Sequence, residues 1–212
     1  MDANRVKRNQ MLAQRVIKGL ESRNMEGYYA ESKEEALAKA LELIPEGSSV
    51  GWGGSMSIEE IGLKDAVCTG NYTVYNRDVC KTPEEKRQTE LSIIGSDYFL
   101  SSSNAITEDG VLVNIDGAAN RVAAISWGPK NVLMIIGMNK IVKSVEDAVS
   151  RARNEAAPIN AQRFPVDTPC KKNGACSDCK SQDSVCCQFL ITRFSKIPKR
   201  IKVILVNEDL GF

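Results

Sequence analysis

Short apolar segments alternate with amphipathic helices along most of this 212-residue chain. Two of the segments, residues 131–136 and 201–206, are nearly unbroken series of Val, Leu, Met and Ile. A strand that is apolar on both of its faces is typical of a parallel sheet, because helices cover such a sheet on both sides. The alternation therefore predicts an α/β fold with a mostly parallel sheet between two layers of helices.

Capping residues indicate where several helices begin. Ser32 with Glu35, and Thr82 with Glu85, form capping boxes, and a third such pattern begins at Ser57. We predict helices over residues 4–23, from 32, 57 and 82, and over 144–156. We predict strands at 48–52, 72–75 and 97–101, and a small antiparallel hairpin over 105–116. Trp52 and Trp127 are expected in the core.

No repeat or low-complexity linker divides the chain, so we expect one domain over residues 1–212. The domain starts with the helix at 4–23. It includes a cysteine-rich excursion at 164–188, where the apolar periodicity is almost absent.

Charge and composition exclude several classes of function. The 28 Lys and Arg residues nearly balance the 27 Asp and Glu residues, which argues against a nucleic-acid binder. No apolar run is long enough for a membrane span, and the N-terminus does not resemble a signal peptide. The chain has no histidine, so catalysis by serine–histidine or cysteine–histidine pairs and histidine-ligated zinc are excluded.

Five of the seven cysteines lie between residues 170 and 187. Cys170, Cys176, Cys179 and Cys186 have a spacing that lets four thiolates surround one zinc ion or iron–sulfur cluster. The alternatives are a reducible disulfide or plain surface thiols. Clustered thiols without a secretion signal favour a protein of the reducing cytoplasm. We expect Cys187 to be a spare thiol, and the other two, Cys68 and Cys80, to be core or incidental cysteines.

A glycine–serine loop follows the strand that ends at Trp52. Gly53, Gly54 and Ser55 lead into the next helix, where backbone N–H groups and a hydroxyl suit a phosphate or carboxylate. The alternative is that the glycines only permit a tight turn and that Ser57 is only a helix cap.

A long polar run lies between two apolar strands. Asn114, Asp116, Asn120 and Arg121 are candidates to converge on the same anionic ligand, with Arg121 supplying a charge-assisted contact. Asp116 is the candidate catalytic base in this run. The alternative is that these side chains only make turns, and that Arg121 and Asp116 pair with each other.

Several motifs resemble the lactate-utilization (LUD) domain family. The runs SSNAITEDG (102–110), LVNIDG (112–117) and NRVA (120–123) carry the resemblance, together with GPK (128–130), GMNKIV (137–142) and AAPINA (156–161). The block from Thr168 to Cys186 is similar to the tail of a subfamily with a C-terminal cysteine cluster. The likeness spans essentially the whole chain.

The resemblance implies a Rossmann-like sheet of the type found in ribose-phosphate isomerases and CoA transferases. It also implies a part in the oxidation of lactate to pyruvate, with partner proteins that carry iron–sulfur clusters. We find neither the catalytic glutamate of CoA transferases nor a nicotinamide or flavin motif of the form Gly-x-Gly-x-x-Gly. Two alternatives stay open: a stand-alone isomerase or transferase acting on a phosphorylated or CoA-linked molecule, and a non-catalytic sensor or scaffold with structural zinc.

Overall fold

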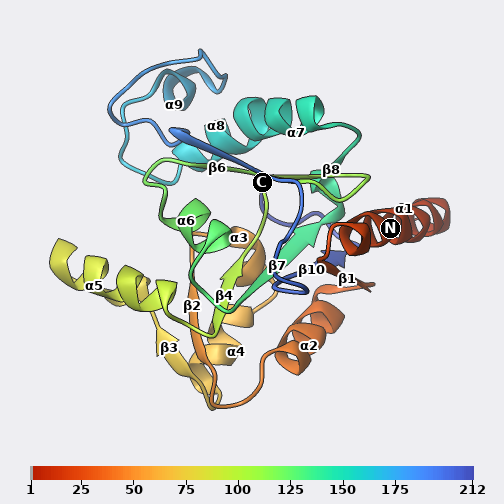
Figure 1. Ribbon diagram of the computed structural model, residues 1–212. Helices are drawn as coiled ribbons and strands as arrows, with labels where there is room; N and C mark the ends of the chain where they lie inside the picture. The colour runs from red at the N-terminus through yellow and green to blue at the C-terminus, as the bar shows by residue number, and fades with distance from the viewer. Residues whose placement is uncertain (1) are drawn as a thin grey trace.

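The computed structural model describes residues 2–212, so the first residue of the predicted 1–212 domain lies outside the described residues. A six-stranded sheet forms the centre of the molecule, and all of its neighbouring strands run parallel (Figure 1). In spatial order its strands are β1 (Glu26–Ala30), β10 (Ile201–Val206), β7 (Asn131–Gly137), β4 (Tyr98–Ser101), β2 (Ser49–Trp52) and β3 (Thr73–Tyr75).

The strand β7 shows why the sheet is buried on both faces. Val132, Met134 and Ile136 pack into one hydrophobic cluster, whereas Leu133 and Ile135 pack into another on the opposite face. Successive side chains of a strand point to opposite faces, so an unbroken apolar run needs cover on both sides. The predicted α/β fold is confirmed.

Different helices supply the cover on the two faces. The helices α1 (Ala3–Ser22), α5 (Pro83–Ile94) and α6 (Asn120–Ser126) contribute to the first cluster. The helices α2 (Lys33–Leu43), α3 (Met56–Glu60) and α4 (Leu63–Thr69) contribute to the second. Among the described residues, no helix combines the length and the apolar character that crossing a membrane requires.

A second sheet of four strands lies beside the first cluster. Its order is β8 (Ile141–Val142), β5 (Ala105–Thr107), β6 (Leu112–Asp116) and β9 (Gln188–Thr192), with β6 antiparallel to both of its neighbours. The pair β5–β6 is the predicted hairpin. Ile106 and Leu112 from this hairpin share the first cluster with β7 and β10, so the two sheets have a common core.

A helical segment covers the outer side of the second sheet, near the top of Figure 1. It begins at Ser144 as predicted, but α7 (Val145–Arg151) passes into a π-helical turn (Ala152–Ala156) and then into α8 (Ala157–Ala161). The short helix α9 (Pro169–Asn173) follows within the cysteine-rich excursion.

Two sequence predictions need correction. The N-cap of α3 is Ser55, and Ser57 is a buried residue inside that helix, where its hydroxyl contacts the neighbouring strand ends. Trp52 lies in the core, but Trp127 ends α6 with 76% of its surface exposed. Cys68 is exposed, which fits the alternative that it is an incidental cysteine.

Candidate functional site

A cavity of about 530 Å³ opens where β2, β4 and β7 end. The loops after these three parallel strands bring Ser55, Ser102 and Lys140 to its wall. The strand β6, the start of α6 and residues 182–187 enclose the other side. Ligands of open parallel sheets bind at the carboxyl ends of the strands, so this cavity has the position expected of a binding site.

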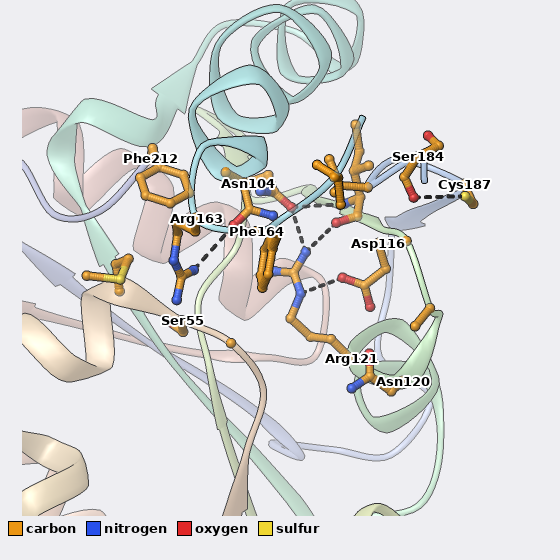
Figure 2. Close-up of a pocket in the computed structure, with 18 of the residues that line it drawn as sticks. Ser55, Asn104, Asp116, Asn120, Arg121, Arg163, Phe164, Ser184, Cys187 and Phe212 are labelled. Carbon is orange, nitrogen blue, oxygen red and sulfur yellow. Dashed lines mark hydrogen bonds and ion pairs between the residues drawn. The ribbon is translucent and has the colours of Figure 1, made fainter. Parts of the chain in front are cut away.

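The guanidinium of Arg121 holds one wall of the cavity together (Figure 2). Its Nε donates to Asp116 Oδ1 at 2.8 Å. Its two terminal nitrogens donate to four oxygens at 2.7 to 3.3 Å: the Ser102 and Ile115 carbonyls and the Asn104 and Asn114 side chains. A guanidinium has five N–H groups, and all five are used here. Arg121 therefore shapes the site and adds positive charge, without a free donor for a ligand.

The other predicted residues of the polar run also have partners within the protein. The second oxygen of Asp116 accepts from the backbone of Val122 at 2.8 Å, so both carboxylate oxygens are engaged. The Asn120 side chain donates to Glu90 at 3.0 Å. Asn114 is fully buried behind the cavity wall, and its side-chain nitrogen has no partner. The pairing of Arg121 with Asp116, which the sequence left as an alternative, is the arrangement in the structure.

Only part of the glycine–serine loop reaches the cavity. Gly54 and Ser55 line the cavity, whereas Gly53 lies behind it. A Cβ atom on Gly53 would come within 3.2 Å of the Arg121 side chain, so a larger residue there would require that side chain to shift by a few tenths of an ångström. The Ser55 hydroxyl is buried without a hydrogen-bond partner, although Ser55 is the N-cap of α3. Such an unpaired buried hydroxyl costs about 1–3 kcal/mol unless a ligand or water satisfies it.

Lys140 lies on the floor of the cavity and is only 2% exposed. It lies three residues after the end of β7, and its ammonium group donates to Ser57 Oγ at 3.0 Å and to Ser102 Oγ at 3.1 Å. The C-terminal residues cover it: a Cβ on Gly211 would be 3.3 Å from the Lys140 nitrogen, and Phe212 lines the cavity. Among the described residues, no carboxylate forms an ion pair with Lys140.

Burial, with the positive charges of Arg151 and Arg121 as smaller causes, lowers the pKa of Lys140 to about 7. The carboxylate of Glu60 opposes this effect. A buried lysine without a carboxylate partner is costly when charged, and such groups concentrate at functional sites. Lys140 is thus positioned to receive an anion, which would supply the missing negative charge.

The mouth of the cavity carries further positive charge. Arg163 and Lys86 line it, and Arg163 stacks over the rings of Phe164 and Phe212. Five basic and two acidic side chains line the cavity in total: Arg77, Lys86, Arg121, Lys140 and Arg163 against Asp116 and Asp183. This balance favours an anionic ligand.

The cysteine segment, which we define as residues 164–188, forms the outer wall of the same cavity. Ser184 and Val185 pack over Gly117, and the Cys187 amide donates to the Asp116 carbonyl at 2.8 Å. All seven cysteines are free thiols. Within residues 2–212, no three Cys, Asp or Glu side chains are gathered in the arrangement of a preformed metal site. The four-cysteine metal centre stays a prediction.

Lys140 was not among the site residues predicted from the sequence, and Ser57 was predicted to be a helix cap. One signal for Lys140 was available, because this lysine follows the most apolar strand of the chain by three residues. A polar group at the carboxyl end of a buried parallel strand lies where such sheets bind ligands.

Replacement of Arg121 by lysine tests its role in the wall. Lysine keeps the charge but has three donors instead of five and no planar fork. We expect Arg121→Lys to lower the free energy of unfolding by about 2–4 kcal/mol, measured by urea denaturation at pH 7. The exposed Arg163 provides the control, and Arg163→Lys should change the free energy by less than about 0.5 kcal/mol. Equal effects of the two substitutions would contradict the role of Arg121 in holding the cavity wall together.

The depressed pKa of Lys140 predicts a pH dependence of stability. Between pH 7 and the ordinary lysine pKa of 10.5, the unfolded chain holds a proton on Lys140 that the folded chain has lost. Stability therefore rises with pH in this window, by at most about 1.4 kcal/mol per pH unit. The difference in unfolding free energy between wild type and Lys140→Met should rise from pH 7 to 9.5, whereas the difference between wild type and Lys7→Met, at an exposed lysine, should stay flat. Two flat differences would show that Lys140 has an ordinary pKa.

Comparison with known proteins gives a family and a fold. A model of the LUD domain family matches residues 13–206. Among solved structures, the chain is similar to a DUF162 family protein from Deinococcus radiodurans, with a TM-score of 0.55 and 12% sequence identity. That alignment covers 93% of this chain and 98% of the other, and at this identity it shows a shared fold. No curated protein matches the sequence.

The family match extends from within α1 to the end of β10, so it includes both sheets and every predicted site residue. It agrees with the resemblance carried by the motifs between Ser102 and Ala161. The chain belongs to the LUD domain family.

Proposed function

We propose that this chain binds a small organic acid of the lactate type and takes part in its oxidation to the keto acid. Partner proteins with iron–sulfur clusters would accept the two electrons that this oxidation releases. The lactate part of the proposal rests on the association of the LUD family with lactate utilization. The anion-binding part rests on the cavity.

One observation carries the anion-binding part: the floor of the cavity is a buried lysine without a carboxylate partner. The carboxylate of a bound acid beside Lys140 would favour its charged form and raise its pKa. The Ser55 hydroxyl, which is buried and unpaired, would find a partner in the same ligand. A bound anion would thus satisfy a charge and a polar group that the protein leaves unsatisfied.

The size of the cavity favours one alternative. Ligand sites commonly measure about 300–1,000 Å³, and 530 Å³ is more than a three-carbon acid requires. A sugar phosphate, or the end of a CoA ester, would fill the space between Lys140 and the basic residues at the mouth. The alternative function is therefore an isomerase or transferase acting on a phosphorylated or CoA-linked molecule.

Ligand binding to three proteins tests the proposal. We would titrate L-lactate, D-lactate, pyruvate, ribose 5-phosphate and acetyl-CoA into wild type, Ser55→Ala and Lys140→Met by calorimetry. A hydrogen bond to a charged group contributes about 1.5–3 kcal/mol, so Lys140→Met should weaken lactate or pyruvate about 10-fold to 150-fold. The loss of a neutral hydroxyl contact in Ser55→Ala should weaken binding about 2-fold to 10-fold.

The exposed Lys7→Met variant is the control and should bind as wild type does. An acid that binds all four proteins equally would place its site elsewhere and contradict the proposal. Binding of only the phosphate or the CoA ester, with the same loss in Lys140→Met, would favour the alternative function.

The role of partner proteins needs a separate measurement. We expect the isolated chain to bind lactate without reducing an artificial electron acceptor, because the electrons leave through the partners. The complex purified from the native cell should reduce the acceptor when lactate is added. Lactate-dependent reduction by the isolated chain at the same rate would contradict the need for partners.

A further inference from the structure

The outer strand of the second sheet leaves one edge of its backbone free. The strand β9 pairs with β6 on one side only, because it is the last strand in the order β8, β5, β6 and β9. Within the described part of the chain, the backbone of residues 188–192 makes no backbone hydrogen bond besides those of this pairing. Unpaired N–H and C=O groups along a strand edge are a template on which a further strand can pair.

Edge strands usually carry a feature that prevents such pairing, and β9 lacks one. Charged side chains, above all lysine, and proline are the common protections. From Gln188 to Thr192 the strand has no charged residue and no proline. Two of its apolar side chains, Phe189 and Ile191, are each 47% exposed. Among the described residues, none of the other edge strands, β1, β3 and β8, has an exposed large apolar side chain.

Phe189 and Ile191 continue an apolar face that the protein buries on the neighbouring strand. They lie opposite Ile115 and Val113 of β6, and residues opposite each other point to the same face of a sheet. These two β6 side chains are buried against α7 and the π-helical turn. The helical cover therefore extends over β6 but leaves the apolar side chains of β9 exposed.

A second copy of this chain fits the free edge of β9. An antiparallel pair of β9 strands centred on Leu190 places Phe189 of each copy opposite Ile191 of the other, on one face of the sheet. The same register places Gln188 opposite Thr192, so apolar residues face apolar residues and polar residues face polar residues. This arrangement has two-fold symmetry, in which the same surface of both copies forms the contact.

The residues that flank β9 fit the same arrangement. Arg193 would lie opposite Cys187 of the second copy, so the two arginines do not face each other. Phe194 and Ile197 follow the strand closely and are also exposed, so apolar surface is present beyond both ends of the pair. A strand of a different protein would need the same uncharged, apolar pattern, which β9 itself provides.

We propose that this chain forms a homodimer through its β9 strands, which joins the two four-stranded sheets into one continuous sheet. The dimer would cover Phe189 and Ile191 of both copies and pair the free backbone edge. It would also hold part of the cavity wall in place, because Ser184, Val185 and Cys187 line the cavity and lead directly into β9.

Sedimentation of the purified chain without ligand tests the proposal. We expect wild type to be mainly a dimer at about 100 µM chain, above a dissociation constant of about 10 µM. Ile191→Lys introduces a charge opposite an apolar side chain twice in each dimer, so it should raise the dissociation constant at least about 10-fold. Val79→Lys is the control, because Val79 is also an exposed apolar residue but lies outside β9, and it should leave the dissociation constant unchanged.

A pair of opposite charges tests the register of the two strands. In the double variant Phe189→Glu with Ile191→Lys, antiparallel pairing brings each introduced glutamate opposite an introduced lysine of the other copy. We expect this variant to dimerise about 3-fold to 30-fold more tightly than Ile191→Lys alone. Far-ultraviolet circular dichroism, which should match that of wild type, shows that each variant is folded.

Two sedimentation results would overturn the proposal. One is a wild-type chain that stays monomeric at about 100 µM. The other is a dimer with the same dissociation constant in wild type, Ile191→Lys and Val79→Lys, because its contact would then lie elsewhere. A double variant that dimerises no better than Ile191→Lys would contradict the register centred on Leu190.

Hydrogen exchange tests the same contact in the unaltered chain. The N–H groups of β9 that point away from β6 are paired in the dimer and free in the monomer. On dilution below the dissociation constant, we expect faster exchange in residues 188–192 and unchanged exchange in β10. Equal exchange of residues 188–192 at both concentrations would overturn the dimer, and so would protection that appears only when cell extract supplies a different protein. Neither result depends on whether the cavity binds an organic acid.

Discussion

All N–H groups of the Arg121 guanidinium donate to oxygen atoms of the protein, and the shape of the cavity depends on these hydrogen bonds. Its partners come from the end of β4, from the start of β5 and from β6, so a single side chain joins the central sheet to the second sheet. Because β6 also carries Asp116, and Asp116 binds the start of α6, the same network sets where that helix begins. Ser102 connects this network to Lys140, because its carbonyl accepts from Arg121 and its hydroxyl accepts from the Lys140 ammonium group.

The fold could be predicted from the sequence because its signals are local. The apolar strands at 131–136 and 201–206, and the capping box at Thr82, depend on neighbouring residues, and the structure has them where they were expected. The helix starting at Ser57 was misplaced because a capping pattern cannot show whether its first residue is already inside the helix. The π-helical turn after α7 has no signal in the apolar periodicity.

The site was harder to predict, because it depends on contacts between distant segments. Ser57, Ser102 and Lys140 are separated by 38 to 83 residues, and only the order of the parallel strands brings them together. The sequence placed Arg121 near a ligand because arginine commonly binds anions. Its five contacts depend on the register of β6 against β5, which residue types alone do not determine. A lone lysine after a strand also has too many ordinary roles to be recognised before its burial is known.

The two C-terminal residues have a practical consequence for work with this protein. Gly211 lies over the Lys140 ammonium group, and Phe212 lines the cavity next to Arg163. Any affinity tag joined after Phe212 would therefore start at the cavity mouth and compete for the same space and charge. None of the residues of α1 lines the cavity, so a tag joined before this helix avoids this contact. When two preparations differ in ligand binding, the position of the tag in each of them should be compared first.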